Sequence, residues 1–163
     1  MQIDYDPAQI SYQALLDIFW ESHNPARKSW SQQYKAAVFV HNAEQRALAE
    51  ASKTQISAEK TGRFFNRTIH TEILPAETFY LAEDYHHKYL LQSSPEYFGE
   101  ITSVYAKMEG WINSTAAARL NGYVGGYGTL AQLETEIDLL GLSERRRDQL
   151  RRLVSRFDKS RHS

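Results

Sequence analysis

The sequence predicts an α/β (α+β) fold over residues 1–92, followed by an all-helical C-terminal extension over residues 93–163. In the first part, short β-rich segments alternate with segments of helical periodicity, whereas every periodic segment beyond Ser93 has helical spacing. With 42% hydrophobic and 24% charged residues, the 163-residue chain has the composition of a folded globular protein.

Three strands and three helices are expected in the first part. The strand segments alternate apolar with polar residues or are rich in β-branched and aromatic ones, and they are residues 1–5, 34–41 and 68–74. The helical segments are residues 10–23, 43–56 and 76–91. Ser11 is the expected N-cap of the first helix, and Asn42 with Gln45 resembles a capping box. Three short strands, the first beginning at residue 1, make a narrow sheet, so we expect a fold that is incomplete at the N-terminus.

The extension is expected to form four helices, at residues 95–111, 114–120, 130–140 and 144–157. Ser94 followed by Pro95 predicts a helix start with proline at the first helical position. Thr129 is an expected N-cap, and Gly141 is an expected helix stop. The glycine-rich segment 121–128 lacks the phosphate-binding motifs, and it predicts a connection that uses glycine for positive φ.

Composition and charge exclude several classes of partner and site. A net charge of −1 argues against nucleic acid or a membrane surface as a partner. Basic residues gather only at 145–152, where acids interrupt them, and a solvated helix face is the simpler interpretation. The absence of an apolar run of membrane-spanning length and of a secretory signal predicts a cytoplasmic protein. The chain has no cysteine, which excludes disulfides, thiolate metal sites and a cysteine nucleophile within it.

The segment 79–90, FYLAEDYHHKYL, raises the question of a metal site. Glu83 and His86 lie three residues apart, which places a carboxylate and an imidazole on one helix face. Di-metal carboxylate proteins use this unit twice, together with two further glutamate-bearing helices. Only one such unit occurs here. No metal and no other cofactor is therefore predicted.

Two tyrosines are candidate binding residues. Tyr34 begins a strand after a glutamine-rich loop, and Tyr89 ends the acidic segment. A phenol can donate a hydrogen bond to a polar oxygen while its ring packs on apolar surface. The residues alone leave open whether each tyrosine binds a ligand or packs half-buried.

Three blocks of the sequence carry a family resemblance. The segments YDPAQISYQALLDIFWESHNP, QQYKAAVFVHNAEQ and EILPAETFYLAEDYHHKYL, in this order, resemble the peptide methionine-(S)-sulfoxide reductase (MsrA) family. The resemblance covers about residues 1–92, and the helical tail looks like an extension present in some members.

The resemblance implies a ferredoxin-like two-layer sandwich and an oxidoreductase that reduces methionine sulfoxide, in proteins or free, as repair after oxidative stress. In the family, a cysteine thiolate attacks the sulfoxide sulfur, methionine leaves, and thiols reduce the sulfenic acid. A thioredoxin-like reductant is the implied partner of the full-length enzyme. Tyr34 and Tyr89 match two tyrosines that line the sulfoxide pocket, the first of which bonds the sulfoxide oxygen.

The chain also departs from the family pattern. The family's Gly-Cys-Phe-Trp nucleophile motif and its His-Ala-Glu motif have no counterpart here. Ser29 and Ser31 stand where the family has aspartate and glycine. Site residues are thus expected for substrate binding, at Tyr34 and Tyr89, but none for catalysis.

Two explanations of these departures are open. The chain is either the C-terminal part of a truncated or split reductase, for example one whose selenocysteine codon was read as a stop, or a degenerate relative. In both cases we expect it to be inactive alone. The alternative from another class is a non-catalytic binding or assembly module that retains a remnant of the sulfoxide pocket.

Overall fold

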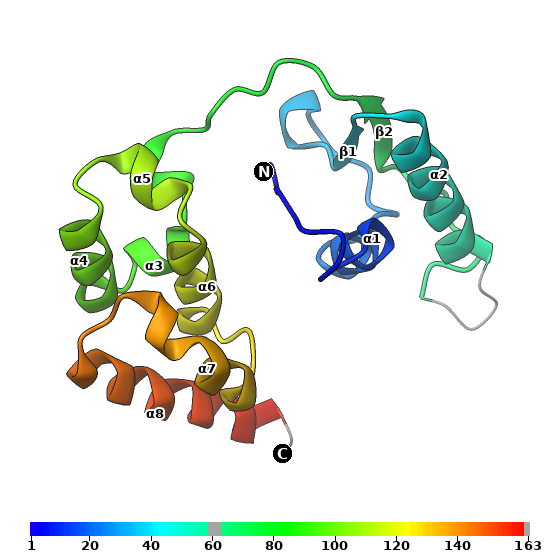
Figure 1. Cartoon of the computed structure of the whole chain (residues 1–163). Helices are drawn as coiled ribbons and strands as arrows, with labels where there is room; N and C mark the ends of the chain where they lie inside the picture. The colour runs from blue at the N-terminus through cyan, green and yellow to red at the C-terminus, as the bar shows by residue number, and fades with distance from the viewer. Residues whose placement is uncertain (59–62, 162–163) are drawn as a thin grey trace. The chain divides into compact units, whose positions relative to one another are not determined.

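The computed structural model describes residues 1–58 and 63–161, and the chain divides into two compact units, Met1–Tyr80 and Leu81–Ser163 (Figure 1). The first unit combines helices with a small parallel sheet, and the second is helical. The mixed fold with a helical C-terminal part is therefore confirmed. The sequence places the boundary after residue 92, whereas the compact units divide after Tyr80.

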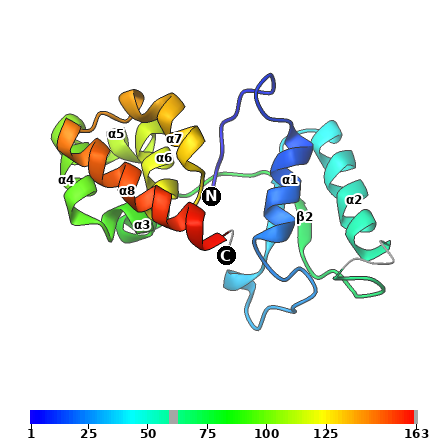
Figure 2. The same ribbon diagram turned by 90° about the horizontal axis from the view of Figure 1, so that it is seen from below.

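The first unit is built on a two-stranded sheet. Strand β1 (Ala37–Val40) pairs in parallel with β2 (Glu72–Pro75), with Val38 opposite Ile73 and Phe39 opposite Leu74. The helix α2 (Ala43–Ala58) connects the strands, and α1 (Tyr12–Glu21) lies beside α2 (Figures 1 and 2). The core between helices and sheet contains four buried side chains: Leu16, Trp20, Val40 and Ala49.

The helix starts predicted at Ser11 and Asn42 are confirmed. Ser11 Oγ accepts a hydrogen bond from Ala14 N at 3.1 Å, as an N-cap does. Asn42 Oδ1 accepts one from Gln45 N at 2.8 Å. The Gln45 side-chain Oε1 accepts a hydrogen bond from His41 N at 2.9 Å. In a capping box it would accept from the amide of the N-cap residue, Asn42, one residue later in the chain.

Hydrogen bonds from buried and half-buried side chains join α1, α2 and the start of β2. Trp20 Nε1 donates to Ser52 Oγ at 3.0 Å, which links α1 to α2. His23 Nε2 lies 3.0 Å from Thr71 Oγ1, and Lys53 Nζ donates to Thr71 O at 2.6 Å. Thr71 is only 2% exposed, so these bonds are shielded from water.

The helical unit packs around α6 (Thr115–Val124), which contacts α3, α5, α8 and the 3₁₀ helix η3 (Figure 2). The other elements of this unit are η2 (Asp84–His86), α3 (Tyr89–Gln92), α4 (Pro95–Val104), α5 (Met108–Ile112), α7 (Leu130–Glu136), η3 (Ile137–Leu140) and α8 (Glu144–Arg161). Its core includes the fully buried Ala117, Leu120, Leu133 and Leu150. Leu91 is also buried there, and its N–H bonds Asn121 Oδ1 at 3.0 Å, which places α3 in this unit.

Local signals in the helical part are mostly confirmed. Thr129 and Gln132 form a full capping box at the start of α7. Gly141 ends η3 in the left-handed conformation, with φ of 68°. The connection after α6 uses positive φ at Gly126 and Gly128. A Cβ at Gly128 would lie 2.7 Å from the Tyr123 ring, so this position also needs glycine for space.

Three predicted elements are wrong. Residues 1–5 form no strand, because among the described residues only β1 and β2 pair. The helix expected at 76–91 is absent: η2 and α3 are its only helical turns, and Lys88 between them is left-handed, with φ of 46°. The helix expected at 95–111 is split into α4 and α5 by Tyr105, whose backbone is extended. No helix in the described part of the chain is long and apolar enough to cross a membrane.

We predict that Tyr12→Phe and Trp20→Phe have different effects on the first unit. The Tyr12 hydroxyl is buried without a hydrogen-bond partner, so its removal should not lower the free energy of unfolding. Trp20→Phe loses the bond to Ser52 and leaves a gap in the core, which should cost about 2 kcal/mol. Urea unfolding followed by circular dichroism measures both changes in the free energy of unfolding. Equal losses in the two variants would contradict the different roles given to the Tyr12 hydroxyl and the Trp20 indole.

A second prediction concerns alkaline stability of the helical unit. Tyr123 Oη donates to Glu136 Oε1 at 2.5 Å, and Arg119 pairs with the same carboxylate at 3.1 Å. Burial and then the bond to Glu136 raise the pKa of Tyr123 well above its ordinary value of 10.0. Because the pKa of the phenol is higher in the folded than in the unfolded state, the protonated Tyr123 contributes its full stabilisation below about pH 10. This contribution is lost as the pH rises through the folded-state pKa.

Tyr123→Phe should therefore flatten the decline of the thermal midpoint above about pH 10, where the unfolded phenol ionises. It should also lower stability near neutral pH by about 1–2 kcal/mol, through loss of a charge-assisted bond. Thermal unfolding between pH 7 and pH 11 tests both effects. If the thermal midpoint of Tyr123→Phe falls with pH above about pH 10 as steeply as that of the wild type, Tyr123 does not cause the alkaline loss of stability.

Candidate functional site

Tyr34 lies at the end of a short 3₁₀ helix, η1 (Gln32–Tyr34), just before β1. Ser31 begins η1 and accepts a hydrogen bond from Gln33 N at 3.2 Å. Ser29 Oγ donates to Ser31 O at 2.7 Å, so Ser29 and Ser31 together fold this turn. The sequence SWSQQY thereby fixes the backbone that carries the Tyr34 side chain.

The Tyr34 ring stacks on Trp30, with centroids 5.2 Å apart and planes 29° from parallel. Both rings face solvent: Trp30 is 82% exposed and Tyr34 is 63% exposed. The Tyr34 hydroxyl makes no hydrogen bond within residues 1–58 and 63–161, so it can donate one to a ligand. A flat apolar surface beside a free phenol suits a ligand that has both an apolar part and a polar oxygen.

Tyr89 is the first residue of α3 and is 62% exposed. Its carbonyl accepts a hydrogen bond from Ser93 Oγ at 2.9 Å, which fixes the single turn of helix. Lys88 precedes it in the left-handed conformation, and burial lowers the pKa of the Lys88 ammonium. Tyr34 belongs to the unit Met1–Tyr80 and Tyr89 to the unit Leu81–Ser163, and each is described within its own unit.

Trp30 is a candidate site residue that was not predicted from the sequence. Its signal is a large aromatic in a serine- and glutamine-rich loop, outside any periodic apolar pattern that would bury it. The segment that was expected to be helical also exposes aromatic rings: Phe79, Tyr80 and Tyr85. Because this segment has no continuous helix, these side chains do not share one helix face.

The Glu83 and His86 side chains form an exposed contact, with His86 Nε2 3.7 Å from Glu83 Oε2. Across the described ranges, no group of three histidine or acidic side chains could hold a metal ion. The His87 ring instead bonds the backbone carbonyl of Ala82 at 3.0 Å. This cluster stabilises a turn before α3.

Comparison with known proteins gives two family matches. The family model described as "Peptide methionine sulfoxide reductase" matches residues 1–118. The model described as "Selenoprotein methionine sulfoxide reductase A, helical domain" matches residues 107–154. Tyr34 and Tyr89 both fall within the first match.

Individual relatives agree with these matches. The peptide methionine sulfoxide reductase of Drosophila melanogaster is 35% identical over 148 residues, which are 90% of this chain and 57% of that protein. The MsrA of Methanosarcina acetivorans is 44% identical over 94 residues, 55% of this chain and 48% of that protein. The MsrA of Saccharophagus degradans is 40% identical over 100 residues, which are 58% of this chain and 46% of that protein. The chain spans about half the length of these curated relatives.

We predict that Trp30 dominates the quenchable tryptophan fluorescence. Trp20 and Trp111 are 5% and 6% exposed, whereas Trp30 is almost fully exposed. Trp30→Phe should remove most of the fluorescence that acrylamide quenches, with the circular dichroism spectrum unchanged. Trp111→Phe is the matched control: it removes a buried tryptophan, keeps the quenchable fluorescence of Trp30, and should therefore leave the quenching constant at or above the wild-type value. Equal quenching in wild type and Trp30→Phe would contradict the exposed stack.

Proposed function

Because the chain belongs to the peptide methionine sulfoxide reductase family, we propose that it takes part in reducing methionine (S)-sulfoxide, in proteins or free, during repair of oxidised proteins. The exposed stack of Trp30 and Tyr34, within the segment that matches the family, carries this proposal. The Trp30 ring offers apolar surface for the sulfoxide methyl group. The Tyr34 hydroxyl donates to the sulfoxide oxygen.

The reduction itself needs a nucleophile that these 163 residues do not contain. A thiolate or selenolate attacks the sulfoxide sulfur and the oxygen is protonated; the bond between substrate sulfur and oxygen then breaks, the hydroxyl is transferred to the nucleophile as a sulfenic or selenenic acid, and the thioether leaves. Two thiols of a thioredoxin-like reductant then form a disulfide, release water and restore the nucleophile. We propose that a longer form of the protein, or a second polypeptide, supplies this residue. The selenoprotein description of the matched helical domain supports a selenocysteine.

The small sheet supports the same proposal. A two-stranded sheet is marginally stable in water, and Phe39 is 57% exposed on the strand β1. We propose that β1 and β2 belong to a wider ferredoxin-like sheet in the active enzyme. The residue that supplies the nucleophile would come with the segment that widens the sheet.

The test separates binding from turnover. With dithiothreitol, the purified chain should not reduce a peptide that contains methionine sulfoxide, because it has no cysteine. It should still bind an (S)-sulfoxide peptide more tightly than the methionine peptide. Tyr34→Phe should weaken this binding about 5- to 10-fold, the effect of one hydrogen bond, while Tyr127→Phe, another exposed tyrosine, should not.

Equal binding of the sulfoxide and methionine peptides would contradict the role of Tyr34. Turnover by the chain alone would contradict the need for an external thiol or selenol. Sulfoxide binding by the chain, without turnover on adding any upstream-encoded Gly-(Cys/Sec)-Phe-Trp segment, would instead favour a binding module. The coding sequence ahead of Met1 shows whether such a segment exists in frame.

A further inference from the structure

The outer face of α8 carries a stripe of long polar side chains. Spacings of four and three residues place them on one side of the helix, and they are Arg145, Gln149, Arg152, Arg156 and Lys159. The opposite side of α8 buries Leu150 and Val154 in the core of the helical unit. The stripe therefore faces away from the core.

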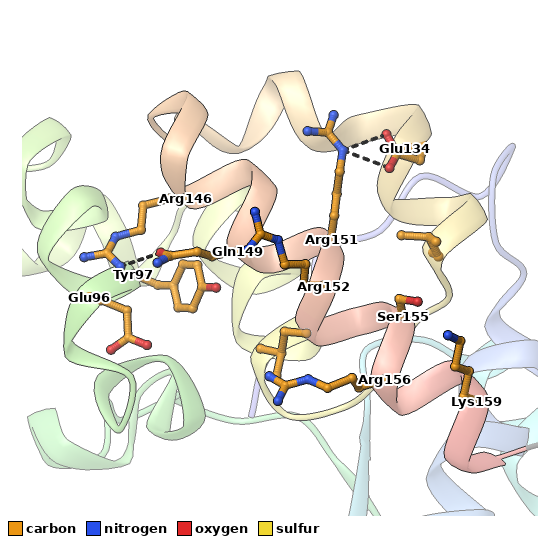
Figure 3. A pocket seen from close by; sticks show the side chains of 12 residues that line it. Glu96, Tyr97, Glu134, Arg146, Gln149, Arg151, Arg152, Ser155, Arg156 and Lys159 are labelled. Carbon is orange, nitrogen blue, oxygen red and sulfur yellow. Dashed lines mark hydrogen bonds and ion pairs between the residues drawn. The ribbon is translucent and has the colours of Figure 1, made fainter.

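An open groove of about 830 Å³ runs along this stripe. Its walls come from α8, from Glu96 and Tyr97 of α4, and from Leu130 and Glu134 of α7 (Figure 3). Leu130 and Leu153, both half-buried, supply apolar surface within it, whereas Tyr97 is only 4% exposed. The groove thus combines an apolar floor with several cationic side chains.

Some of these cations are already neutralised. Arg151 pairs with Glu134 at 2.9 Å and with Asp148 at 3.1 Å. Arg146 Nη1 donates to Gln149 Oε1 at 2.6 Å, and its Nε lies 3.7 Å from Glu100. In Figure 3 Arg151 turns toward Glu134, away from the side of the groove that holds Tyr97.

Arg152 and Arg156 differ from these neighbours. Neither makes an ion pair or a side-chain hydrogen bond within the part of the chain that the structure describes. Both extend from α8 in the direction of Tyr97 (Figure 3), and the charge of Arg156 acts on the Tyr97 hydroxyl. Two uncompensated guanidinium groups consequently lie next to apolar surface.

We propose that this groove binds an acidic segment of a partner protein, with two carboxylates on Arg152 and Arg156 and an apolar side chain on the half-buried Leu153. Arg152 and Arg156 are one helical turn apart, a rise of about 6 Å. Carboxylates two residues apart on an extended segment, at about 6.6 Å, match this spacing. Guanidinium groups bind carboxylates in a bidentate manner, which sets the register of the segment.

The surroundings favour carboxylates on a protein over a nucleic acid. Glu96 and Glu134 line the same groove and would repel a continuous phosphate backbone. The net charge of the chain is −1, so no general field attracts a polyanion. An acidic segment with few charges meets less of this repulsion, and its apolar residue gains contact with Leu153. This proposal concerns the helical unit and does not depend on the reduction chemistry.

The test uses the full chain and a labelled twelve-residue peptide of alternating Glu and Leu, followed by fluorescence anisotropy. The same peptide with Gln in place of Glu is the ligand control. The Glu peptide should bind at least 10-fold more tightly than the Gln peptide at low salt, and less tightly at high salt. Arg152→Gln with Arg156→Gln should reduce the affinity about 10-fold or more, because two charge-assisted pairs are lost.

The matched control is Arg63→Gln with Arg67→Gln, which removes two exposed arginines of the other unit and should change the affinity less than about 2-fold. Circular dichroism checks that both double variants fold. Equal affinity for the Glu and Gln peptides, or equal loss in both double variants, would overturn the proposal. Tighter binding of a 20-base-pair DNA duplex or of phosphatidylserine vesicles, lost in the Arg152 and Arg156 variant, would also overturn it.

Discussion

The parallel pairing of β1 with β2 is the contact on which the first unit depends. A parallel pair cannot be closed by a tight turn, so α2 must cross over from one strand to the next and cover the sheet on the way. Two strands alone are marginal, and the stability has to come from the helices packed on them. Thr71, just before β2, shows how this is achieved: its hydroxyl bonds His23 at the end of α1, and its carbonyl bonds Lys53 of α2. The sheet register thus depends on contacts from both helices.

The same pairing determines where the candidate site residues lie. In a parallel pair both strands run in one direction, so the turn that carries Trp30 and Tyr34 precedes β1 at the amino end of the sheet. The chain that follows Pro75 leaves β2 at the carboxyl end. The salt bridge between Lys35, two residues before β1, and Glu72, the first residue of β2, has a length of 2.7 Å and holds the Tyr34 turn against β2. Tyr34 is therefore positioned by the sheet, whereas Tyr89 is positioned by the packing of α3 on α6.

The predictions from the sequence are correct where a side chain only a few residues away determines the structure. Ser11 and Thr129 each accept a hydrogen bond from the helix amide three residues away, so their roles can be predicted from the chain alone. The predictions are wrong where contacts with residues distant in the sequence determine the structure. Residues 1–5 alternate as a strand does, but a strand forms only beside another strand. The helix pattern at 76–91 buries no side chain before Leu91, so most of it has no packing to stabilise a helix. Tyr34 was identified by family resemblance, and its stacking on Trp30 became visible only in three dimensions.

The side chains on the outer face of α8 are not needed to fill the core of the helical unit. Leu150 and Val154 on the inner face fill that core, and the pairs of Arg146 and Arg151 with nearby acids accompany the packing of α8 against α4 and α7. Arg152 and Arg156 contribute to none of these contacts, so the fold does not account for their presence. A sulfoxide site in one unit and a carboxylate-binding groove in the other would be joined by the continuous chain at Tyr80 and Leu81. Binding a partner at the groove would then raise its effective concentration at the sulfoxide site without any new contact there.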